Sequence, residues 1–512
     1  MKKIGFLFCL FLFVLVLTNH RVFGQDIGRE IPYRYGFIDP TGKYVIQSQF
    51  DSAGNFYDGL AQVRIERGST RYAGYIDRSG QYVIPPQFDD FSENFSEGLA
   101  TVKHNGKFGY IDQTGKFVIP PKFEKADSFS EGLAGVYLKK KKGYINKQGE
   151  FVIKPKFKGG TQFVEGVAIV WTGVGEQMRL IDKTGEYITP SFDYINDRLD
   201  EIFPEFDEEG LARIGFGGQI CQQCNSDVIN SKWGYIDRTG KIVIPPKFDE
   251  KPKPFSDGRA SIYIPNEPDD LYMKRSGKYG YIDKTGEFVI PPKYDSADAF
   301  SEGLASVGIN DSNSSLRINM GYIDVSGKYV IPPPKGGGGR FSEGLAKNIN
   351  IIDLYGYLDR TGQWAIPPKF KSADNFKDGL AKVTIEEKKG FLQEKPENKY
   401  GLIDKTGKYV VEPLFDEIYD FSEGIAAVRL GEKWGYIDRT GKYIAEPQFD
   451  LAGKFQSGMA IVGMKNCQGQ ECEAGTKHSF SFPFQHQSCN LMGKIQGFLG
   501  RVGVKLSTLI LN

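Results

Sequence analysis

The chain has 512 residues, and its 65 lysines and arginines nearly balance its 64 aspartates and glutamates, so that the formal charge is +1. This balance provides no electrostatic footprint for nucleic acid, and we expect no nucleic-acid partner. Aromatic residues make up 13% of the chain, which is somewhat rich for a soluble protein, and we expect most of them in the core.

The N-terminal segment has the features of an export signal. The letters M-K-K are followed by an apolar run over residues 4–17, and Val22-Phe23-Gly24 offers tolerated residues before a cleavage point. A short basic start before such a run is typical of a secretory signal peptide. We therefore interpret residues 1–24 as a signal peptide and the mature chain as periplasmic, surface-held or secreted. An uncleaved anchor is the alternative, and we predict no transmembrane segment in the mature chain.

A tandem repeat fills the chain from about residue 33 to about residue 463. The phrase K-W/Y/F-G-Y-I-D-x-T-G-K-x-V-I-P-P-K-F is followed by F-S-E-G-L-A-x-V, and eleven such units occur, one of them with Arg179 in the first glycine position. The spacing from the first phrase to the second is nearly constant, whereas the spacing to the next unit more than doubles between units. Each unit therefore has a fixed part and a surface loop that tolerates insertion.

The unit that begins at Lys232 reads as β-structure. Alternation in W-G-Y-I is typical of a strand, and its glycine is expected to allow the close approach of another backbone. The letters D-R-T-G after it predict a turn, in which the aspartate caps and the glycine supplies a positive φ. Residues 241–244 form the returning strand, which Pro245 and Pro246 are expected to end. A third strand, L-A-x-V, follows the second turn.

Two global arrangements fit these units. The sequence predicts an all-β fold of about eleven three-stranded antiparallel units, which must stack on one another to bury a core. We favour an open superhelical stack, because eleven units are too many for an ordinary ring and three strands are one fewer than a usual blade. The alternative is one or two closed β-propellers.

The repeat phrase resembles the WG repeat, also called the KWG repeat. The resemblance covers most of the mature chain, residues 25–465, and is specific through its repetition rather than through one motif. It implies no catalytic residues and no cofactor, so the signature residues are interpreted as structural. The two copies that match best contain Trp233, Gly234, Tyr235, Asp237 and Gly240, and Trp434, Gly435, Tyr436, Asp438 and Gly441.

The cysteines that follow the signal peptide lie in a loop and in the tail. Cys221 and Cys224 are in the longest variable loop, and Cys467 and Cys472 are in residues 466–512, where the repeat pattern stops. Export favours disulfides over thiols, so we predict a local disulfide for each pair. A zinc site in the tail is the alternative, but the Cys and His spacings are irregular, and we predict no metal site.

The polar residues do not form a catalytic constellation. Acids such as Glu131 and Asp237 recur in nearly every unit, which favours turn capping over the two special carboxylates of a glycosidase. His104 has no nucleophile near it in sequence, so a Ser-His-Asp arrangement has no support. The basic run Lys139–Lys142 is interpreted as an exposed hairpin loop. We therefore expect no enzymatic activity.

Two functional hypotheses remain. The first is a non-enzymatic exported scaffold that binds a protein or an envelope component through the long loops after Gly210, Gly258, Gly303 and Gly379, where the units differ most. The second is a carbohydrate-binding array that stacks exposed rings, such as Trp364, on an envelope polysaccharide and gains avidity from repetition. The identity of the partner and the oligomeric state stay open.

Overall fold

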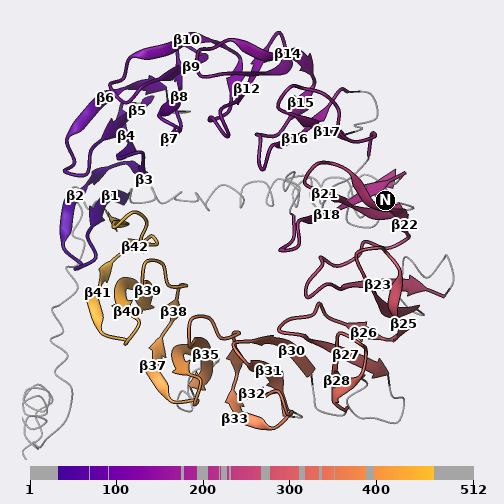
Figure 1. Ribbon diagram of the computed structural model, residues 1–512. Helices are drawn as coiled ribbons and strands as arrows, with labels where there is room; N and C mark the ends of the chain where they lie inside the picture. Colours follow the sequence, from indigo (N-terminus) through magenta and orange to yellow (C-terminus); the bar gives the residue numbers. More distant parts are fainter. Residues whose placement is uncertain are drawn as a thin grey trace, which may run out of the picture. The chain divides into compact units, whose positions relative to one another are not determined.

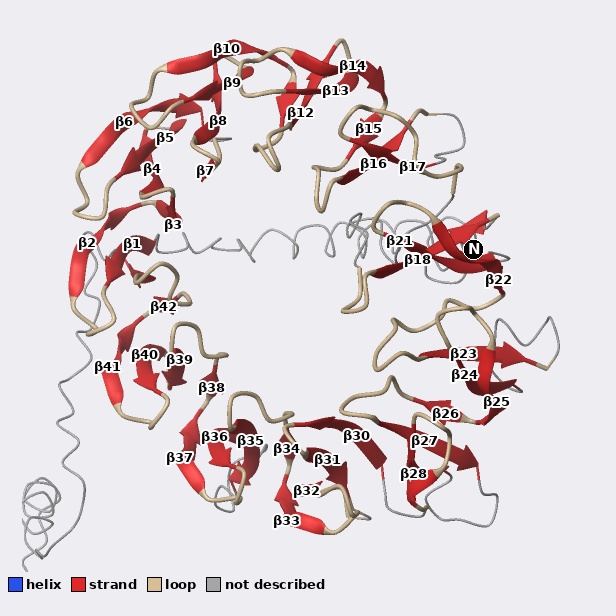
Figure 2. Cartoon of the chain, in the orientation of Figure 1, coloured by secondary structure: helices blue, strands red, loops and turns tan. Residues whose placement is uncertain are grey.

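The computed structural model describes residues 33–68, 70–89, 92–173, 178–192, 206–217, 219–220, 228–229, 232–266, 277–310, 318–333, 337–350, 352–387 and 397–465. Every regular element in these ranges is a β-strand (Figure 2). The predicted signal peptide, the tail and all four cysteines of the predicted disulfides lie outside the described residues. The chain divides into two compact units, Met1–Asn466 and Cys467–Asn512, and all described residues belong to the first.

The strands form eleven small antiparallel sheets, which we call blades 1 to 11 (Figure 1). The first five blades are blade 1 with β1 (Tyr33–Ile38), β2 (Tyr44–Phe50), β42 (Leu451–Ala452) and β43 (Ala460–Lys465); blade 2 with β3 (Ser52–Tyr57), β4 (Leu60–Arg67), β5 (Thr70–Ile76) and β6 (Tyr82–Asp89); blade 3 with β7 (Phe95–Ser96), β8 (Leu99–His104), β9 (Lys107–Ile111) and β10 (Phe117–Phe123); blade 4 with β11 (Lys125–Ala126), β12 (Ala134–Leu138), β13 (Lys141–Ile145) and β14 (Phe151–Phe157); and blade 5 with β15 (Gly159–Gly160), β16 (Val167–Trp171) and β17 (Met178–Asp182).

The remaining blades follow the same order. They are blade 6 with β18 (Leu211–Phe216), β21 (Lys232–Asp237) and β22 (Ile242–Phe248); blade 7 with β23 (Ala260–Pro265), β24 (Gly277–Ile282) and β25 (Phe288–Tyr294); blade 8 with β26 (Ser296–Ala297), β27 (Leu304–Asn310), β28 (Ile318–Asp324) and β29 (Tyr329–Ile331); blade 9 with β30 (Gly337–Ser342), β31 (Leu345–Ile349), β32 (Tyr355–Leu358) and β33 (Trp364–Phe370); blade 10 with β34 (Ser372–Ala373), β35 (Leu380–Glu387), β36 (Glu397–Asp404) and β37 (Tyr409–Phe415); and blade 11 with β38 (Glu417–Ile418), β39 (Ile425–Leu430), β40 (Lys433–Asp438) and β41 (Tyr443–Phe449). A separate two-stranded ribbon pairs β19 (Gln219–Ile220) with β20 (Val228–Ile229).

A complete blade has four strands, which we call a, b, c and d, as in the order β11-β12-β13-β14 of blade 4. Strand b carries L-A-x-V, strand c carries G-Y-I-D, and strand d carries V-I-P-P-K-F. Strand d runs along the outer rim, as β6, β10 and β41 do in Figure 1, while strands such as β7 and β38 lie toward the centre. The prediction of three strands per unit is corrected, because the short strand a has only two residues in most blades and too little alternation to be recognised.

The two ends of the repeat region form one sheet. Strand β1 pairs antiparallel with β43 from Tyr33↔Lys465 to Ile38↔Ala460, so blade 1 takes its strands c and d from the start of the repeat region and its strands a and b from the end. The repeat in the sequence is therefore out of phase with the blade. The favoured open superhelical stack is wrong, and its alternative, a propeller, is the observed arrangement, because closure pairs the strand edges that an open stack would leave free.

The hydrophobic core is divided among the seams between neighbouring blades. Each of eleven buried clusters combines residues of two adjacent blades, and one of them joins Phe449 of blade 11 to Val462 of blade 1. A single small sheet buries little apolar surface, so each blade depends on both of its neighbours. The ring is thus held together by its seams.

The glycine of strand c lies under strand d. A Cβ on Gly109 would lie 2.6 Å from the carbonyl oxygen of Ile119 and 2.7 Å from the nitrogen of Pro121, which confirms the predicted close approach of another backbone. The register of β9 and β10 shifts between Ile119 and Phe123, where the two prolines sit. The prolines were expected to end the strand; instead they form a bulge on the outer edge strand, where a missing N–H is tolerated and further edge pairing is blocked.

Candidate functional site: the two faces of the ring

The antiparallel order separates two kinds of connection. Strands a and c run one way and strands b and d run the other, so the a–b and c–d turns lie on one face of the ring, which we call the turn face. The b–c connections and the links to the next blade lie on the opposite face, which we call the loop face. The repeat phrases S-E-G and D-x-T-G form the turn face, and the connections of variable length start on the loop face.

The c–d turns are closed by their own aspartates. Asp237 Oδ1 accepts hydrogen bonds from the Thr239 backbone N–H at 2.9 Å, the Thr239 hydroxyl at 2.6 Å and the Lys241 backbone N–H at 3.1 Å. The same arrangement recurs in blade 11, where the Thr440 hydroxyl holds the pKa of the Asp438 carboxyl below its ordinary value. These aspartates therefore stay ionised and serve as acceptors within the turn.

Most a–b turns place a glutamate or an aspartate where its side chain reaches the next blade. Glu131 and Gly132 have φ values of 53° and 86°, and two successive positive φ values are typical of a type I′ hairpin turn. The Glu131 carboxylate accepts a hydrogen bond from the Gly166 N–H at 2.8 Å and pairs with Lys183 at 3.1 Å. Partial burial opposes ionisation of Glu131, but Lys183 and the N–H of Gly166 outweigh it, and its pKa is lowered.

The same contact links most neighbouring turns of this face. Among the described acids with a shifted pKa, the shift is always downward, so none has the raised pKa of a general acid. The recurring acids are thus acceptors between blades as well as turn caps. The carboxylate-to-amide pairs are Asp58–Gly98, Glu97–Gly132, Glu131–Gly166, Glu209–Gly258, Asp257–Gly303, Glu302–Gly344, Glu343–Gly379 and Glu423–Gly458.

The tyrosine of G-Y-I-D fastens one blade to the next. Tyr235 is fully buried; its hydroxyl donates to the Lys253 carbonyl oxygen at 2.7 Å, and its ring centroid lies 4.8 Å from that of Phe255 in blade 7. Burial raises the pKa of this phenol well above its ordinary value. We call this residue the seam tyrosine. The pairs of seam tyrosine and carbonyl acceptor are Tyr75–Glu93, Tyr110–Asp127, Tyr144–Thr161, Tyr235–Lys253, Tyr281–Asp298, Tyr322–Gly339, Tyr357–Asp374 and Tyr436–Gly453.

In the repeat copy that contains Trp233, the other signature residues lie in the sheet of blade 6 or in the turn after strand β21. Trp233 is 5% exposed, and Gly234 lies under the bulge of strand d. Gly240 has a φ of 79°, and a Cβ on it would lie 2.8 Å from the Ile188 side chain of the preceding blade. The D-x-T-G glycine therefore provides both a left-handed turn and room for a neighbouring blade.

The second copy repeats this placement. Trp434 is 7% exposed, and its ring centroid lies 4.6 Å from that of Tyr419. A Cβ on Gly435 would lie 2.6 Å from the Ala445 carbonyl oxygen, and Gly441 has a φ of 84°. Tyr436 donates to the Gly453 carbonyl oxygen at 2.9 Å. Sequence reasoning missed that the tyrosine bridges two blades, although a phenylalanine recurs at a nearly constant distance after it.

One basic residue lies in the ring wall. The run Lys139–Lys142 was predicted to be an exposed loop, but Lys142 is 2% exposed and occupies the position of the tryptophan in K-W-G. Its ammonium pairs with Asp127 at 2.6 Å and donates to the Gly160 carbonyl oxygen. The prediction is corrected for Lys142, because Gly135 on the adjacent strand β12 has no side chain, and a Cβ there would overlap the Lys142 side chain.

The loop face carries the length variation. In blade 3 the b–c connection is the pair Asn105 and Gly106, whereas residues 267–276, 311–317 and 388–396 are longer connections that lie outside the described residues. The strands that these connections join are described, and each connection leaves from the loop face. The long loops predicted after Gly258, Gly303 and Gly379 therefore start on one common face.

The described residues offer no metal site and no membrane span. No group of three or more His, Cys, Asp or Glu in this part of the chain could hold a metal ion. No helix in the ranges given above is long and apolar enough to cross a membrane.

A closed ring of small antiparallel sheets, each packed against its neighbours, defines a β-propeller, here with eleven blades. The family model of the WG containing repeat matches the chain nine times and covers more than half of it, so the chain belongs to the WG-repeat family. No curated protein matches the sequence. The matched residues are 35–67, 74–108, 108–141, 143–170, 233–264, 279–311, 355–388, 400–434 and 434–466.

Several solved structures are similar at low identity. A tricorn protease matches with 10% identity and a TM-score of 0.25 over 79% of this chain and 44% of that chain. A eukaryotic initiation factor matches with 9% identity and a TM-score of 0.31 over 74% and 94% of the two chains. An uncharacterized protein of Listeria monocytogenes matches with 13% identity and a TM-score of 0.26 over 68% and 90%. The chain spans less than half of the tricorn protease chain, and TM-scores this low carry no argument about function.

Proposed function

We propose that this WG-repeat propeller is a non-enzymatic exported scaffold that binds another protein or a cell-envelope component through its loop face. The observation that carries the proposal is the common origin of the long b–c connections on that face. The turn face, by contrast, repeats the same hydrogen-bonded turns from blade to blade. Specificity is expected where units differ, because repeated turns present nearly the same chemistry in every blade.

The charges of the described acids support a binding role over a catalytic one. Their carboxylates are bonded to backbone N–H groups and to basic side chains of the next blade, as Glu343 is to Gly379 and Lys405. A hydrolase needs an acid or base in an environment unlike that of its repeats. The basic apolar start of the chain supports export.

The test shortens one long connection at a time. Residues 267–276, 311–317 or 388–396 are each replaced by Asn-Gly, the short connection of blade 3, and each variant is used for pull-down from envelope extract beside a polysaccharide panel. We expect one variant to lose an identified protein partner at least about ten-fold, since one loop should hold the main contacts. Lys116→Ala, an exposed change on the turn face, is the matched control and should keep the partner.

A different result would overturn the proposal. If a polysaccharide retains the protein, free sugar competes, and all three shortened variants bind as well as the parent chain, the binding surface is not the loop face. The carbohydrate hypothesis would then direct attention to exposed rings such as Trp364, which is 38% exposed on the outer strand β33.

A further inference from the structure

The seam between blades 10 and 11 lacks the seam tyrosine. In the preceding seam, Tyr357 donates to the Asp374 carbonyl oxygen at 2.6 Å, and its ring centroid lies 4.8 Å from that of Phe376. At the corresponding position of blade 10, the letters K-Y-G-L-I-D place Leu402 in strand c. The ring that would pack against Phe421 is therefore missing from this seam.

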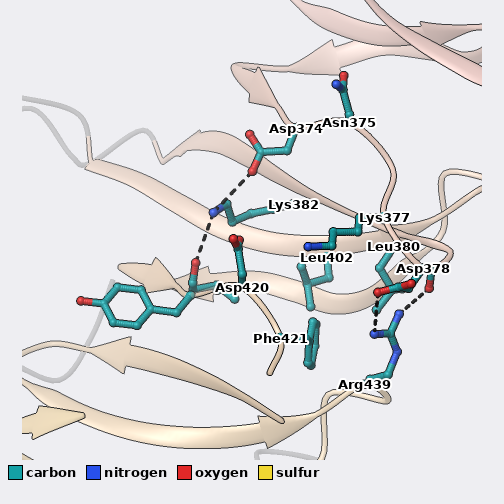
Figure 3. Close-up of a pocket in the computed structure, with 12 residues that line it drawn as sticks. Asp374, Asn375, Lys377, Asp378, Leu380, Lys382, Leu402, Asp420, Phe421 and Arg439 are labelled. Carbon is teal, nitrogen blue, oxygen red and sulfur yellow. Dashed lines mark hydrogen bonds and ion pairs between the residues drawn. The ribbon is translucent and has the colours of Figure 1, made fainter. Parts of the chain in front are cut away.

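A cleft of about 140 Å³ lies at this seam (Figure 3). Leu380, Leu402 and Phe421 contribute apolar surface to it, and charged side chains of both blades stand around it. Phe421 is only half-buried, whereas its counterparts Phe376 and Phe455 are each 1% exposed. A cavity of roughly 150 Å³ lined by Leu, Ile and Phe accepts benzene, so the cleft has the volume of one aromatic ring.

The cleft also holds a hydrogen-bond acceptor in the position that a phenol uses elsewhere. In eight of the other ten seams a tyrosine hydroxyl donates to the carbonyl oxygen two residues before the phenylalanine. Phe37 and Leu180 occupy the tyrosine position in the remaining two. In the seam of blades 10 and 11 the corresponding carbonyl oxygen belongs to Tyr419. Tyr419 lines the cleft, and its N–H donates to the Ala427 carbonyl oxygen at 2.9 Å. No hydrogen bond from a described residue reaches the Tyr419 carbonyl oxygen.

Charged groups lie beside this apolar surface, but they do not replace the missing aromatic ring of the seam tyrosine. The Arg439 guanidinium lies 5.1 Å from the centroid of Phe421 and donates to the Asp378 carbonyl oxygen. Lys382 donates to the Ile418 carbonyl oxygen at 3.3 Å and pairs with Asp374 at 3.4 Å. Figure 3 draws the pair of Lys382 and Asp374 as a dashed line. The Arg439–Asp378 and Lys382–Ile418 contacts join blade 10 to blade 11, the Lys382–Asp374 pair lies within blade 10, and the Arg439–Phe421 contact lies within blade 11. Together they fix the walls of the cleft.

We propose that the seam between blades 10 and 11 is a binding site for a phenol, either free or as the tyrosine side chain of a partner. The ring packs against Phe421 and Leu402, and its hydroxyl donates to the Tyr419 carbonyl oxygen. The protein itself provides the template, since eight other seams hold a phenol in this arrangement. The site stands whether or not the loop face binds a partner.

The experiment titrates the full chain with p-cresol and measures binding by calorimetry and protein NMR. We expect saturable binding with a dissociation constant on the order of 0.1–1 mM, as suits a ligand of so few atoms. Toluene lacks the hydroxyl and should bind about five-fold more weakly, because one hydrogen bond is lost. Equal binding of toluene and p-cresol, or no saturation by about 10 mM p-cresol, would overturn the proposal.

Two variants locate the site. Leu402→Tyr fills the cleft with the missing side chain and should abolish p-cresol binding, whereas Leu402→Ile keeps an aliphatic side chain of similar size and should retain it. Unchanged binding to Leu402→Tyr would place the ligand elsewhere and overturn the proposal. If Leu402→Tyr does not fold, Phe421→Leu removes the ring wall and should weaken binding about five-fold; unchanged affinity of that variant would equally overturn the site.

The source of the phenol is distinguished by a second ligand. N-acetyl-tyrosinamide carries the phenol on a peptide-like backbone, and binding comparable to that of p-cresol would support a tyrosine of a partner as the occupant. Binding of p-cresol alone would support a free phenol, because the seam would then exclude the backbone. Both results require loss of binding in Leu402→Tyr.

Discussion

Blade 10 takes part in two seams that differ in their polar contacts. Toward blade 9, Ser342 donates to the Phe376 carbonyl oxygen at 2.6 Å, and the Glu343 carboxylate accepts from the Gly379 N–H at 3.0 Å, in addition to the seam tyrosine. Toward blade 11, the corresponding positions hold Lys377 and Asp378, and these two bonds and the tyrosine bond are not formed by the described residues.

The seam of blades 10 and 11, which lacks these three bonds among the described residues and is called the incomplete seam, shows which contacts the propeller needs to stay closed. Its apolar cluster is intact and packs Val411 and Phe415 of blade 10 against Ala426 and Val428 of blade 11. In a closed ring, separating one pair of blades also strains the other seams, so one seam can lose polar contacts and still stay closed. A seam of this kind is free to acquire a ligand.

Removing the seam tyrosine from the seam of blades 9 and 10 should have the largest effect on stability. We expect Tyr357→Leu to lower the free energy of unfolding by about 2–3 kcal/mol, because a fully buried ring and its hydrogen bond are lost. Urea unfolding followed by tryptophan fluorescence measures the change. Tyr57→Leu, at a position that is 38% exposed, is the control and should change little. Equal effects of both variants would show that the seam tyrosine is not a stabilising contact.

The reverse conversion should stabilise the protein. We expect Leu402→Tyr to raise the free energy of unfolding by about 1–2 kcal/mol, because the new ring fills a cleft and its hydroxyl can donate to Tyr419. The same urea titration measures this gain, and Leu402→Ile should show none. A loss of stability in Leu402→Tyr would mean that the walls of this seam have moved closer than those of its neighbours.

Substitutions of the acids on the turn face should change the free energy of unfolding by a smaller amount. Glu343→Gln removes a carboxylate that accepts from Gly379 and pairs with Lys405 at 2.9 Å, and we expect a loss of about 0.5–1 kcal/mol, limited by solvent exposure. Asp378→Asn should cost less, since Asp378 pairs with Arg439 only at 3.7 Å. Thermal unfolding at low and high salt compares them, and an equal cost at both salt levels would contradict the ionic part of the argument.

The dependence of stability on pH should come equally from the c–d turns of blades 9, 10 and 11, which form the two seams. The lowered pKa values of Asp359, Asp404 and Asp438 are caused chiefly by hydroxyl hydrogen bonds in the c–d turns. A carboxyl with a lower pKa in the folded state stabilises the fold above its unfolded pKa, and this stability is lost as the pH falls through the folded value. We expect the urea midpoint to be constant above about pH 5 and to fall below it. Asp404→Asn should flatten part of this fall, and an unchanged slope would show that the turn hydrogen bond does not contribute.

Much of the local structure could be read from the residues. Alternation in K-W-G-Y-I-D predicts strand β21, D-R-T-G predicts the turn after it, and the glycine predicts a close backbone approach, because each depends on chemistry within a few residues. The two-residue strands such as β34 could not be predicted, since their pairing depends on the bulge and turn that precede strand b. Nor could the cleft at Leu402, because one aliphatic residue in a repeat does not show what its neighbouring blade leaves empty.

The sequence by itself determined the repeating strands and the turns, because these depend on residues that lie close together in the chain. It also determined the number of units, because each unit carries a copy of the repeat phrase. Only the tertiary structure decided that the units close into a ring, because closure depends on small rotations between blades that add up over the whole array. It also decided the partners of the seam tyrosines and turn-face acids, whose acceptors and donors lie in the next blade. Those bonds exist only once two blades have packed together.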